Sequence, residues 1–134
     1  MDASLEGKTI GAMSLFVEDL AATKEFYRRV FSREAVFEDA VSCVFSFGDT
    51  VINLLQVSEA PGLIGPAPVA DAGSGSRFQL TIWVDDADAT VADLRDRGVT
   101  FINGPIDRPW GVRTAAFTDP AGHIWEVAQP LHGS

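Results

Sequence analysis

Hydrophobic and polar residues alternate along several short stretches of this chain, while two other stretches repeat at the spacing of an amphipathic helix. Alternation over residues 9–17 and 78–84 predicts strands, and each strand leads to an aspartate, Asp19 or Asp86, that can cap a helix. Apolar side chains after Asp19 recur at helical spacing, which predicts a helix with one buried side. Each half of the chain therefore begins with a strand, a carboxylate turn and a helix.

Three further strands are predicted in each half. They cover residues 34–38, 41–47 and 50–57 in the first half, and 99–102, 112–118 and 123–129 in the second. A loop is expected over residues 103–111, because this stretch is interrupted by Gly and Pro. The order β-α-β-β-β thus occurs twice, which predicts an α+β fold.

The two halves also share an internal repeat. Residues 16–28, FVEDLAATKEFYR, correspond to residues 83–95, WVDDADATVADLR, at an offset of 67 residues, which is half of the 134-residue chain. Between the halves, residues 58–76 contain seven Pro or Gly in nineteen and predict a linker. We expect one domain over residues 1–134, with one module at about 8–57, a second at about 77–129, and a ligand-binding seam between them.

Strand periodicity assigns side chains to the two faces of the predicted sheet. Apolar residues such as Leu15 and Ile82 fall on the faces that pack against the helices. The opposite faces collect small, polar and aromatic side chains, and a curved sheet with such a face forms a pocket. The residues expected to line it are Phe16, Asn53, Leu55, Gln79, Thr81, Trp83 and Glu126.

A further group of candidate ligand-binding residues lies in the Pro/Gly-containing loop before residue 112. Trp110 is flanked there by Arg108 and Arg113, a pattern that can hold an anionic or aromatic ligand by ion pairing and stacking. The alternative is a loop anchored by a buried Trp110, with both arginines paired to surface carboxylates.

Composition excludes several classes of partner. The chain has 10 Lys and Arg against 19 Asp and Glu, a net charge of −9, and no basic run, so nucleic acid is not an expected partner. No stretch approaches the roughly 18 consecutive apolar residues that span a bilayer, so no membrane is expected either. A single cysteine and an N-terminus without a secretory pattern predict a cytoplasmic protein.

The doubled module, the opening at residues 16–27 and the closing sequence DPAGHIWE at 119–126 together resemble the vicinal oxygen chelate superfamily. Its members include glyoxalase I, extradiol dioxygenases, fosfomycin-resistance enzymes and bleomycin-resistance proteins. The resemblance implies two βαβββ modules that form a cupped, incomplete β-barrel sheet with helices on the outer face, usually in a homodimer.

Metalloenzymes of this superfamily hold a divalent ion with four residues, usually His or Gln, then Glu, then His, then Glu. Counting along the repeat, the resemblance places these positions at Ala12, Asn53, Gln79 and Glu126, of which only Glu126 matches. Catalytic divalent sites need about three protein ligands. No cofactor is therefore predicted, and a divalent metal would require a ligand set completed by partners.

Three functions remain open from the sequence. The first is a metal-independent protein that binds or sequesters a small aromatic or amphipathic molecule, as the bleomycin-resistance branch does. The second is a lyase, an isomerase or a dioxygenase, with Glu126 as general base or metal ligand. The third is a dimeric interaction module without a small ligand.

Overall fold

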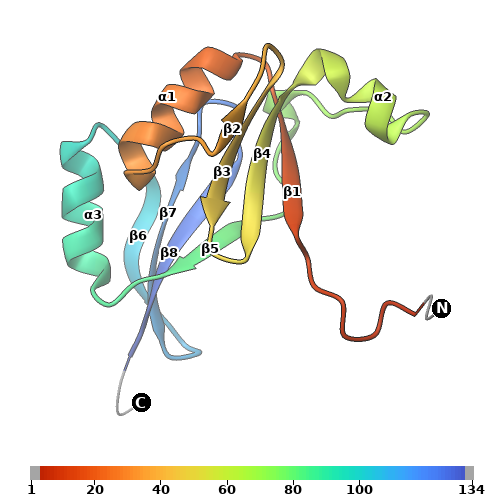
Figure 1. Ribbon diagram of the computed structural model, residues 1–134. Helices are drawn as coiled ribbons and strands as arrows, with labels where there is room; N and C mark the ends of the chain where they lie inside the picture. The colour runs from red at the N-terminus through yellow and green to blue at the C-terminus, as the bar shows by residue number, and fades with distance from the viewer. Residues whose placement is uncertain (1–3, 132–134) are drawn as a thin grey trace.

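The computed structural model describes residues 4–131 as two four-stranded sheets with helices (Figure 1). The first sheet contains β1 (Ala12–Val17), β4 (Thr50–Gln56), β3 (Ser42–Phe47) and β2 (Phe37–Glu38), in that order. The second contains β5 (Leu80–Trp83), β8 (Ile124–Pro130), β7 (Val112–Thr118) and β6 (Phe101–Arg108). In each sheet the first pair is parallel and the others are antiparallel. The expected α+β fold with two open-sheet modules is confirmed.

Two long helices connect the first two strands of each module. Helix α1 (Leu20–Phe31) begins where a carboxylate oxygen of Asp19 accepts the backbone N–H of Ala22, at 3.0 Å. Helix α3 (Ala87–Asp96) begins in the same way, with Asp86 accepting the backbone N–H of Ala89 at 3.0 Å. Both aspartates therefore act as the N-caps that the sequence predicted.

The segment between the modules contains only short helical turns. These are η1 (Val57–Glu59), α2 (Pro61–Ile64) and η2 (Ala72–Ser74). The described part of the chain holds no helix long and apolar enough to cross a membrane.

The prediction of a loop over residues 103–111 is wrong for most of that range. Strand β6 continues to Arg108, and its pairing with β7 shifts register around Asn103 and again before Ile106. Gly104, at φ +87°, lies so close to the backbone of Thr114 that a side chain could not fit there. The glycine that suggested a loop instead permits an irregular strand.

The hydrophobic core lies between the two sheets and is organised by α1. The ring of Tyr27 lies 5.7 Å from Phe45 of β3 and 5.8 Å from Trp125 of β8, measured between ring centres. Phe31 likewise contacts Phe47 of β3 at 5.2 Å and Trp125 at 4.7 Å. Figure 1 shows α1 between β2 and β3 on one side and the strands of the second sheet on the other. One helix thus contributes to the packing of both modules.

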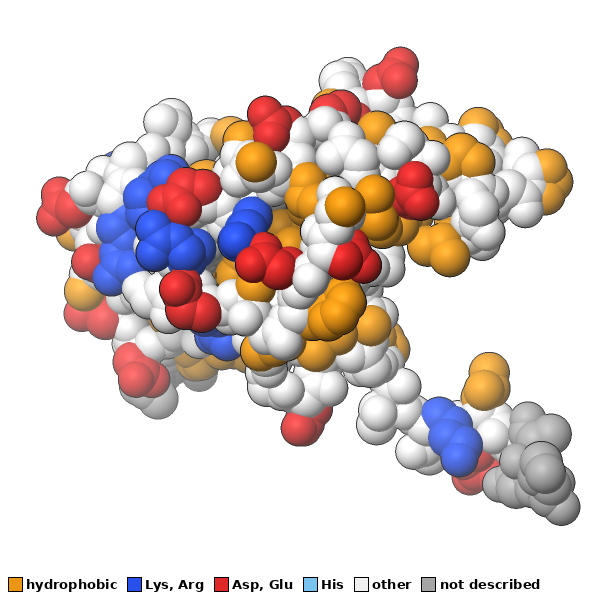
Figure 2. Space-filling model, turned by 45° about the horizontal axis from the view of Figure 1, so that its top comes forward, with side chains coloured by type: hydrophobic (Ala, Val, Ile, Leu, Met, Phe, Trp, Pro, Cys, Tyr) orange, Lys and Arg blue, Asp and Glu red, His pale blue; other side chains and the backbone are white. Residues whose placement is uncertain are grey.

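Charged side chains fix the ends of the two helices. In Figure 2 most of the visible Lys and Arg side chains gather at the left and lie beside Asp and Glu side chains. Arg28 pairs with Glu25 at 2.9 Å, and Arg97 pairs with Asp93 at 3.1 Å. Arg29 donates to the backbone carbonyl of Arg97 at 3.0 Å, and Arg97 donates to that of Arg29 at 3.0 Å. The arginines therefore join the C-terminal ends of α1 and α3.

Candidate functional site

Each sheet presents one face to the shared core and the other face away from it. Leu15, Leu54, Phe117 and Val127 belong to one continuous buried cluster, so the helix-packed faces of both sheets meet in the same core. The opposite faces, which carry the candidate site residues, consequently point away from that core. We call them the first outer face, which carries Ser14, Phe16, Val44, Asn53 and Leu55, and the second outer face, which carries Thr81, Trp83, Arg108, Thr114, Ala116 and Glu126.

Each outer face carries one polar pair at a position related by the internal repeat. On the first outer face the Asn53 side-chain amide donates to the hydroxyl of Ser14 at 3.2 Å. On the second the hydroxyl of Thr81 donates to a carboxylate oxygen of Glu126 at 2.9 Å. Ser14 lies directly opposite Asn53 in its sheet, and Thr81 lies directly opposite Glu126 in the other. The duplication has therefore preserved a cross-strand polar contact in both modules.

The four positions that correspond to the superfamily's metal ligands do not fit a divalent ion. Ala12 offers a methyl group, and Gln79 lies exposed before β5 begins. The Asn53 side-chain oxygen is buried without a hydrogen-bond partner in the described structure. An amide oxygen is, however, a weak neutral ligand for a transition-metal ion. Among residues 4–131, no group of three or more His, Cys, Asp and Glu is placed to share an ion. We therefore derive no chemistry through a metal.

The second outer face combines an exposed aromatic ring with a buried floor of small side chains. Trp83 of β5 is 67% exposed, although it lies within a strand. Thr114 and Ala116 of β7, on the same face beyond β8, are nearly fully buried. Arg108 donates to the hydroxyl of Thr114 at 2.9 Å and so lies on the same face as Glu126. The surface can offer stacking, a cation and a carboxylate to one small molecule.

The loop group around Trp110 is only partly assembled. Trp110 lies in the turn between β6 and β7 and is 71% exposed, so it is not a buried anchor. Arg113 pairs with Asp107 at 2.6 Å and with Asp88 of α3 at 3.1 Å, and therefore lies on the helix-packed side of the sheet. The pKa of Asp107 is lowered by its hydrogen bond from Arg113. The expected pair of arginines around Trp110 is thus not formed, because Arg113 points toward α3.

The other candidate residues fall into two groups that do not meet within one chain. Phe16, Asn53 and Leu55 lie on the first outer face. Thr81, Trp83 and Glu126 lie on the second, with Gln79 two residues ahead of Thr81. Since α1 fills the space between the sheets, one chain does not close these faces around a common cavity. Their joint contact with a ligand stays a prediction.

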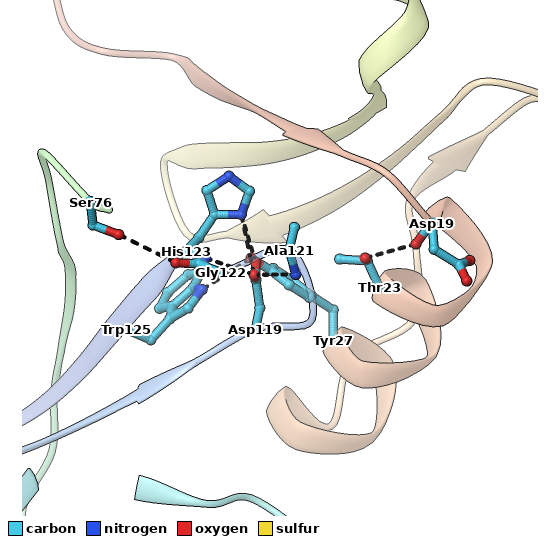
Figure 3. A network of polar contacts seen from close by, with 9 residues as sticks. All are labelled: Asp19, Thr23, Tyr27, Ser76, Asp119, Ala121, Gly122, His123 and Trp125. Atoms are coloured by element: carbon cyan, nitrogen blue, oxygen red, sulfur yellow. Dashed lines mark hydrogen bonds and ion pairs between the residues drawn. The ribbon is translucent and has the colours of Figure 1, made fainter. Parts of the chain in front are cut away.

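Sequence reasoning missed a buried network between the modules, shown in Figure 3. The hydroxyl of Tyr27 donates to Asp119 at 2.8 Å and accepts the indole N–H of Trp125 at 3.0 Å. Asp119 also contacts the imidazole of His123, whose Nδ1 lies 3.0 Å from its Oδ2. Burial and the neighbouring Asp119 carboxylate raise the pKa of Tyr27, which keeps its hydroxyl a donor. The signal in the sequence that could have indicated this network is a carboxylate in a short turn that is followed by a histidine.

The buried thiol of Cys43 has no place in either outer face. Its backbone pairs with Leu54, and its side chain belongs to the core. Burial raises the pKa of the Cys43 thiol, which disfavours the nucleophilic thiolate.

Comparison with known proteins agrees with this architecture. Residues 9–127 match the Glyoxalase/Bleomycin resistance protein/Dioxygenase superfamily. The chain is 31% identical over 121 residues to the uncharacterized protein YraH of Bacillus subtilis, covering 87% of this chain and 94% of that protein.

Solved structures show the same fold. A glyoxalase/bleomycin resistance protein/dioxygenase from Nocardioides superposes with a TM-score of 0.86 at 24% identity, covering 98% of this chain and 89% of the other. A family enzyme from Burkholderia phytofirmans superposes with a TM-score of 0.76 at 21% identity, covering 90% and 98%. With its two βαβββ modules and a match over most of its length, the chain belongs to the Glyoxalase/Bleomycin resistance protein/Dioxygenase superfamily, also called the vicinal oxygen chelate superfamily.

Proposed function

We propose that this protein binds a small aromatic or amphipathic molecule without a metal, in a cup that two copies of the chain form together. The observation that carries the proposal is Trp83, an indole 67% exposed at the end of β5 and on the same face as the hydrogen-bonded pair of Thr81 and Glu126. An aromatic side chain held by a sheet and left open to solvent is a favourable contact for an apolar ring.

The direction of the outer faces supports a homodimer. Because each face points away from the core of its own chain, the cup needs a first outer face from one protomer and a second outer face from its partner. Both faces carry exposed hydrophobic side chains, Phe37 on the first and Ile106 on the second, whose burial would favour association. The buried Asn53 oxygen on the first face adds an acceptor that a ligand could satisfy.

The test uses 1-anilino-8-naphthalenesulfonate, an aromatic amphipathic dye, as the probe. We expect saturable dye binding by the folded protein, and Trp83→Ala should weaken it by at least about tenfold. Leu63→Ala is the matched control, because it also removes an exposed hydrophobic side chain but lies on α2. Equal affinities for the wild type and Trp83→Ala would refute this location of the site. Analytical ultracentrifugation measures the dimer separately, and a monomer at all concentrations would refute the shared cup.

The enzymatic alternative assigns Glu126 the role of a general base. Thr81 holds one carboxylate oxygen, which orients the group for proton transfer at the other. Under this alternative Glu126→Gln keeps ligand affinity and abolishes turnover. Under the binding proposal the same variant changes affinity only. A dimer to which no aromatic or amphipathic compound binds would instead support an interaction module.

A further inference from the structure

We infer that a second ligand site, which borders the first outer face at Ser14 and Phe16 but is built around His123, lies where the segment between the modules covers one end of β1 and faces the turn between β7 and β8. The structure has a cavity of about 340 Å³ there. Its wall includes Phe16 and Glu18, Pro68 and Val69 of the intermodule segment, and Phe78 and His123. All of these residues belong to one chain, so the cavity needs no second copy.

His123 is the one side chain in this cavity that a buried carboxylate orients. Its Nδ1 lies 3.0 Å from Oδ2 and 3.2 Å from Oδ1 of Asp119. Asp119 is fully buried and also accepts the backbone N–H groups of Ala121 and His123, each at 2.9 Å. A carboxylate in such a setting only accepts hydrogen bonds, so Nδ1 of the imidazole carries a proton. In the neutral ring Nε2 is then the acceptor.

The acceptor atom of His123 is left available to a ligand. In Figure 3 the ring nitrogen that does not contact Asp119 points away from the network. The side chain is 15% exposed and lines the cavity. Within residues 4–131, Nε2 has no hydrogen-bond partner. A fixed, largely buried acceptor without a partner on the protein is suited to binding a donor from outside.

The network behind Asp119 keeps this arrangement rigid. The hydroxyl of Tyr27 donates to the carboxylate and in turn accepts the indole N–H of Trp125, so neither module can move away without breaking a buried hydrogen bond. The His123 imidazole is thus a base that the Asp119 carboxylate orients. In such an arrangement an imidazole can accept a proton from a bound hydroxyl.

The chemistry of the walls selects a phenolic ligand. Phe78 lies 6.1 Å from the His123 ring between ring centres, and together with Phe16 and Val69 it provides apolar contact for an aromatic ring. In the proposed complex the ring of the phenol lies against these apolar side chains, and its hydroxyl donates to Nε2 of His123. When the proton transfers, it leaves the phenol oxygen for Nε2, and the resulting imidazolium is stabilised by Asp119. Arg77 also lines the cavity and contributes a positive charge to its walls.

The probe for this site is p-nitrophenol, whose absorption differs between the phenol and the phenolate. At a pH where the free probe is mostly protonated, we expect saturable binding with an increase in the phenolate band. His123→Gln should remove the band change and lower affinity at least tenfold, while the melting temperature verifies folding. Phe78→Ala should lower affinity without removing the band change, because it deletes a wall and leaves the acceptor. Leu63→Ala is the control on the exposed α2 turn, and binding should be unchanged.

Three results would overturn the inference. They are no saturable binding by the wild-type protein, an unchanged phenolate band in His123→Gln, and loss of p-nitrophenol binding in Trp83→Ala, which would place the probe on the second outer face. The proposed cup is tested with a different dye and by Trp83→Ala. Failure of one site is therefore distinguishable from failure of the other.

Discussion

The hydroxyl oxygen of Tyr27 lies 2.8 Å from a carboxylate oxygen of Asp119, so the first helix of one module is hydrogen-bonded to the last turn of the other. These residues are 92 positions apart in the chain, and both are almost completely buried. The same hydroxyl accepts from the indole of Trp125 at 3.0 Å. One phenol thus satisfies the buried indole N–H of Trp125 and shares Oδ2 of Asp119 with the imidazole of His123.

Removing this hydroxyl should destabilise the whole fold. Tyr27→Phe keeps the ring in the core but leaves the Trp125 indole N–H without its partner, and it leaves Oδ2 of Asp119 with the imidazole of His123 alone. We expect a loss of about 1–3 kcal/mol in the free energy of unfolding, measured by urea denaturation. Ser46→Ala is the control, because its exposed hydroxyl makes only a 3.5 Å contact. A loss of less than about 0.5 kcal/mol would mean that water or rearrangement replaces the lost contacts.

Gly104 and Gly98 should respond differently to the same substitution. Both have positive φ, +87° and +91°, so alanine at either position costs about 1–2 kcal/mol in backbone conformation. At Gly98 a Cβ atom meets nothing within 4 Å, whereas at Gly104 it would overlap the carbonyl of Thr114 and lie 2.6 Å from the Cα of Ala115. Gly104→Ala should therefore be more destabilising than Gly98→Ala by at least about 1 kcal/mol in thermal or urea unfolding. Similar losses would show that β6 can move away from β7 at little cost.

The two helix caps should contribute about equally. Asp19→Ala and Asp86→Ala each remove the carboxylate that accepts a first-turn N–H, at a cost of about 1 kcal/mol each. Asn at either position keeps an acceptor and should retain most of the stability. The double alanine variant should lose the sum of the two within about 0.5 kcal/mol, because the caps share no partner. A clearly smaller sum in urea unfolding would indicate that the two helix starts are coupled.

The elements predicted correctly from the sequence are those set by local signals. Asp19 and Asp86 stand directly before apolar residues at helical spacing, so both helix starts were predictable. The extension of β6 was not, because its pairing depends on register shifts around Asn103 and on the close approach of Gly104 to Thr114. These are tertiary relationships, and Gly with Pro is locally the signature of a loop.

For the candidate site, strand alternation predicted which residues share a face but not how the faces are oriented. It placed Thr81 with Glu126 correctly, because alternation is a property of each strand. The direction of the two sheets is set by Phe31 and Tyr27, which pack against aromatic rings of both modules. No local period encodes such contacts. For the same reason Arg113 was assigned to a ligand group, although Asp88 of α3 holds it on the other side.

Restoring the missing ligand positions should create a metal site. Wild-type protein should show no tight Zn²⁺ binding by calorimetry, since Ala12, Asn53 and Gln79 supply no ionic or imidazole donor. The variant Ala12→His, Asn53→Glu, Gln79→His should bind Zn²⁺ with Glu126 as the fourth ligand, once a dimer brings the outer faces together. Adding Glu126→Gln to this variant should weaken the new site. Stoichiometric Zn²⁺ in the wild-type protein would instead show that other residues complete a native set.

Acid should reduce the stability contributed by the turn before β3. One carboxylate oxygen of Asp39 accepts the backbone N–H groups of Val41 and Ser42 and the Ser42 hydroxyl, at 2.8 to 2.9 Å. These bonds, that from Val41 foremost, lower the pKa of Asp39 in the folded state. The folded pKa of Asp39 therefore lies below the unfolded value of about 3.9. The contribution of its carboxylate to the stability of the fold is complete above that pH and is lost as the pH falls through the folded pKa. Asp39→Asn should be less stable than the wild type at neutral pH, and this difference in urea midpoint should shrink below about pH 4. A difference that stays constant down to about pH 2 would mean that Asp39 contributes through geometry that the neutral amide or protonated acid also provides.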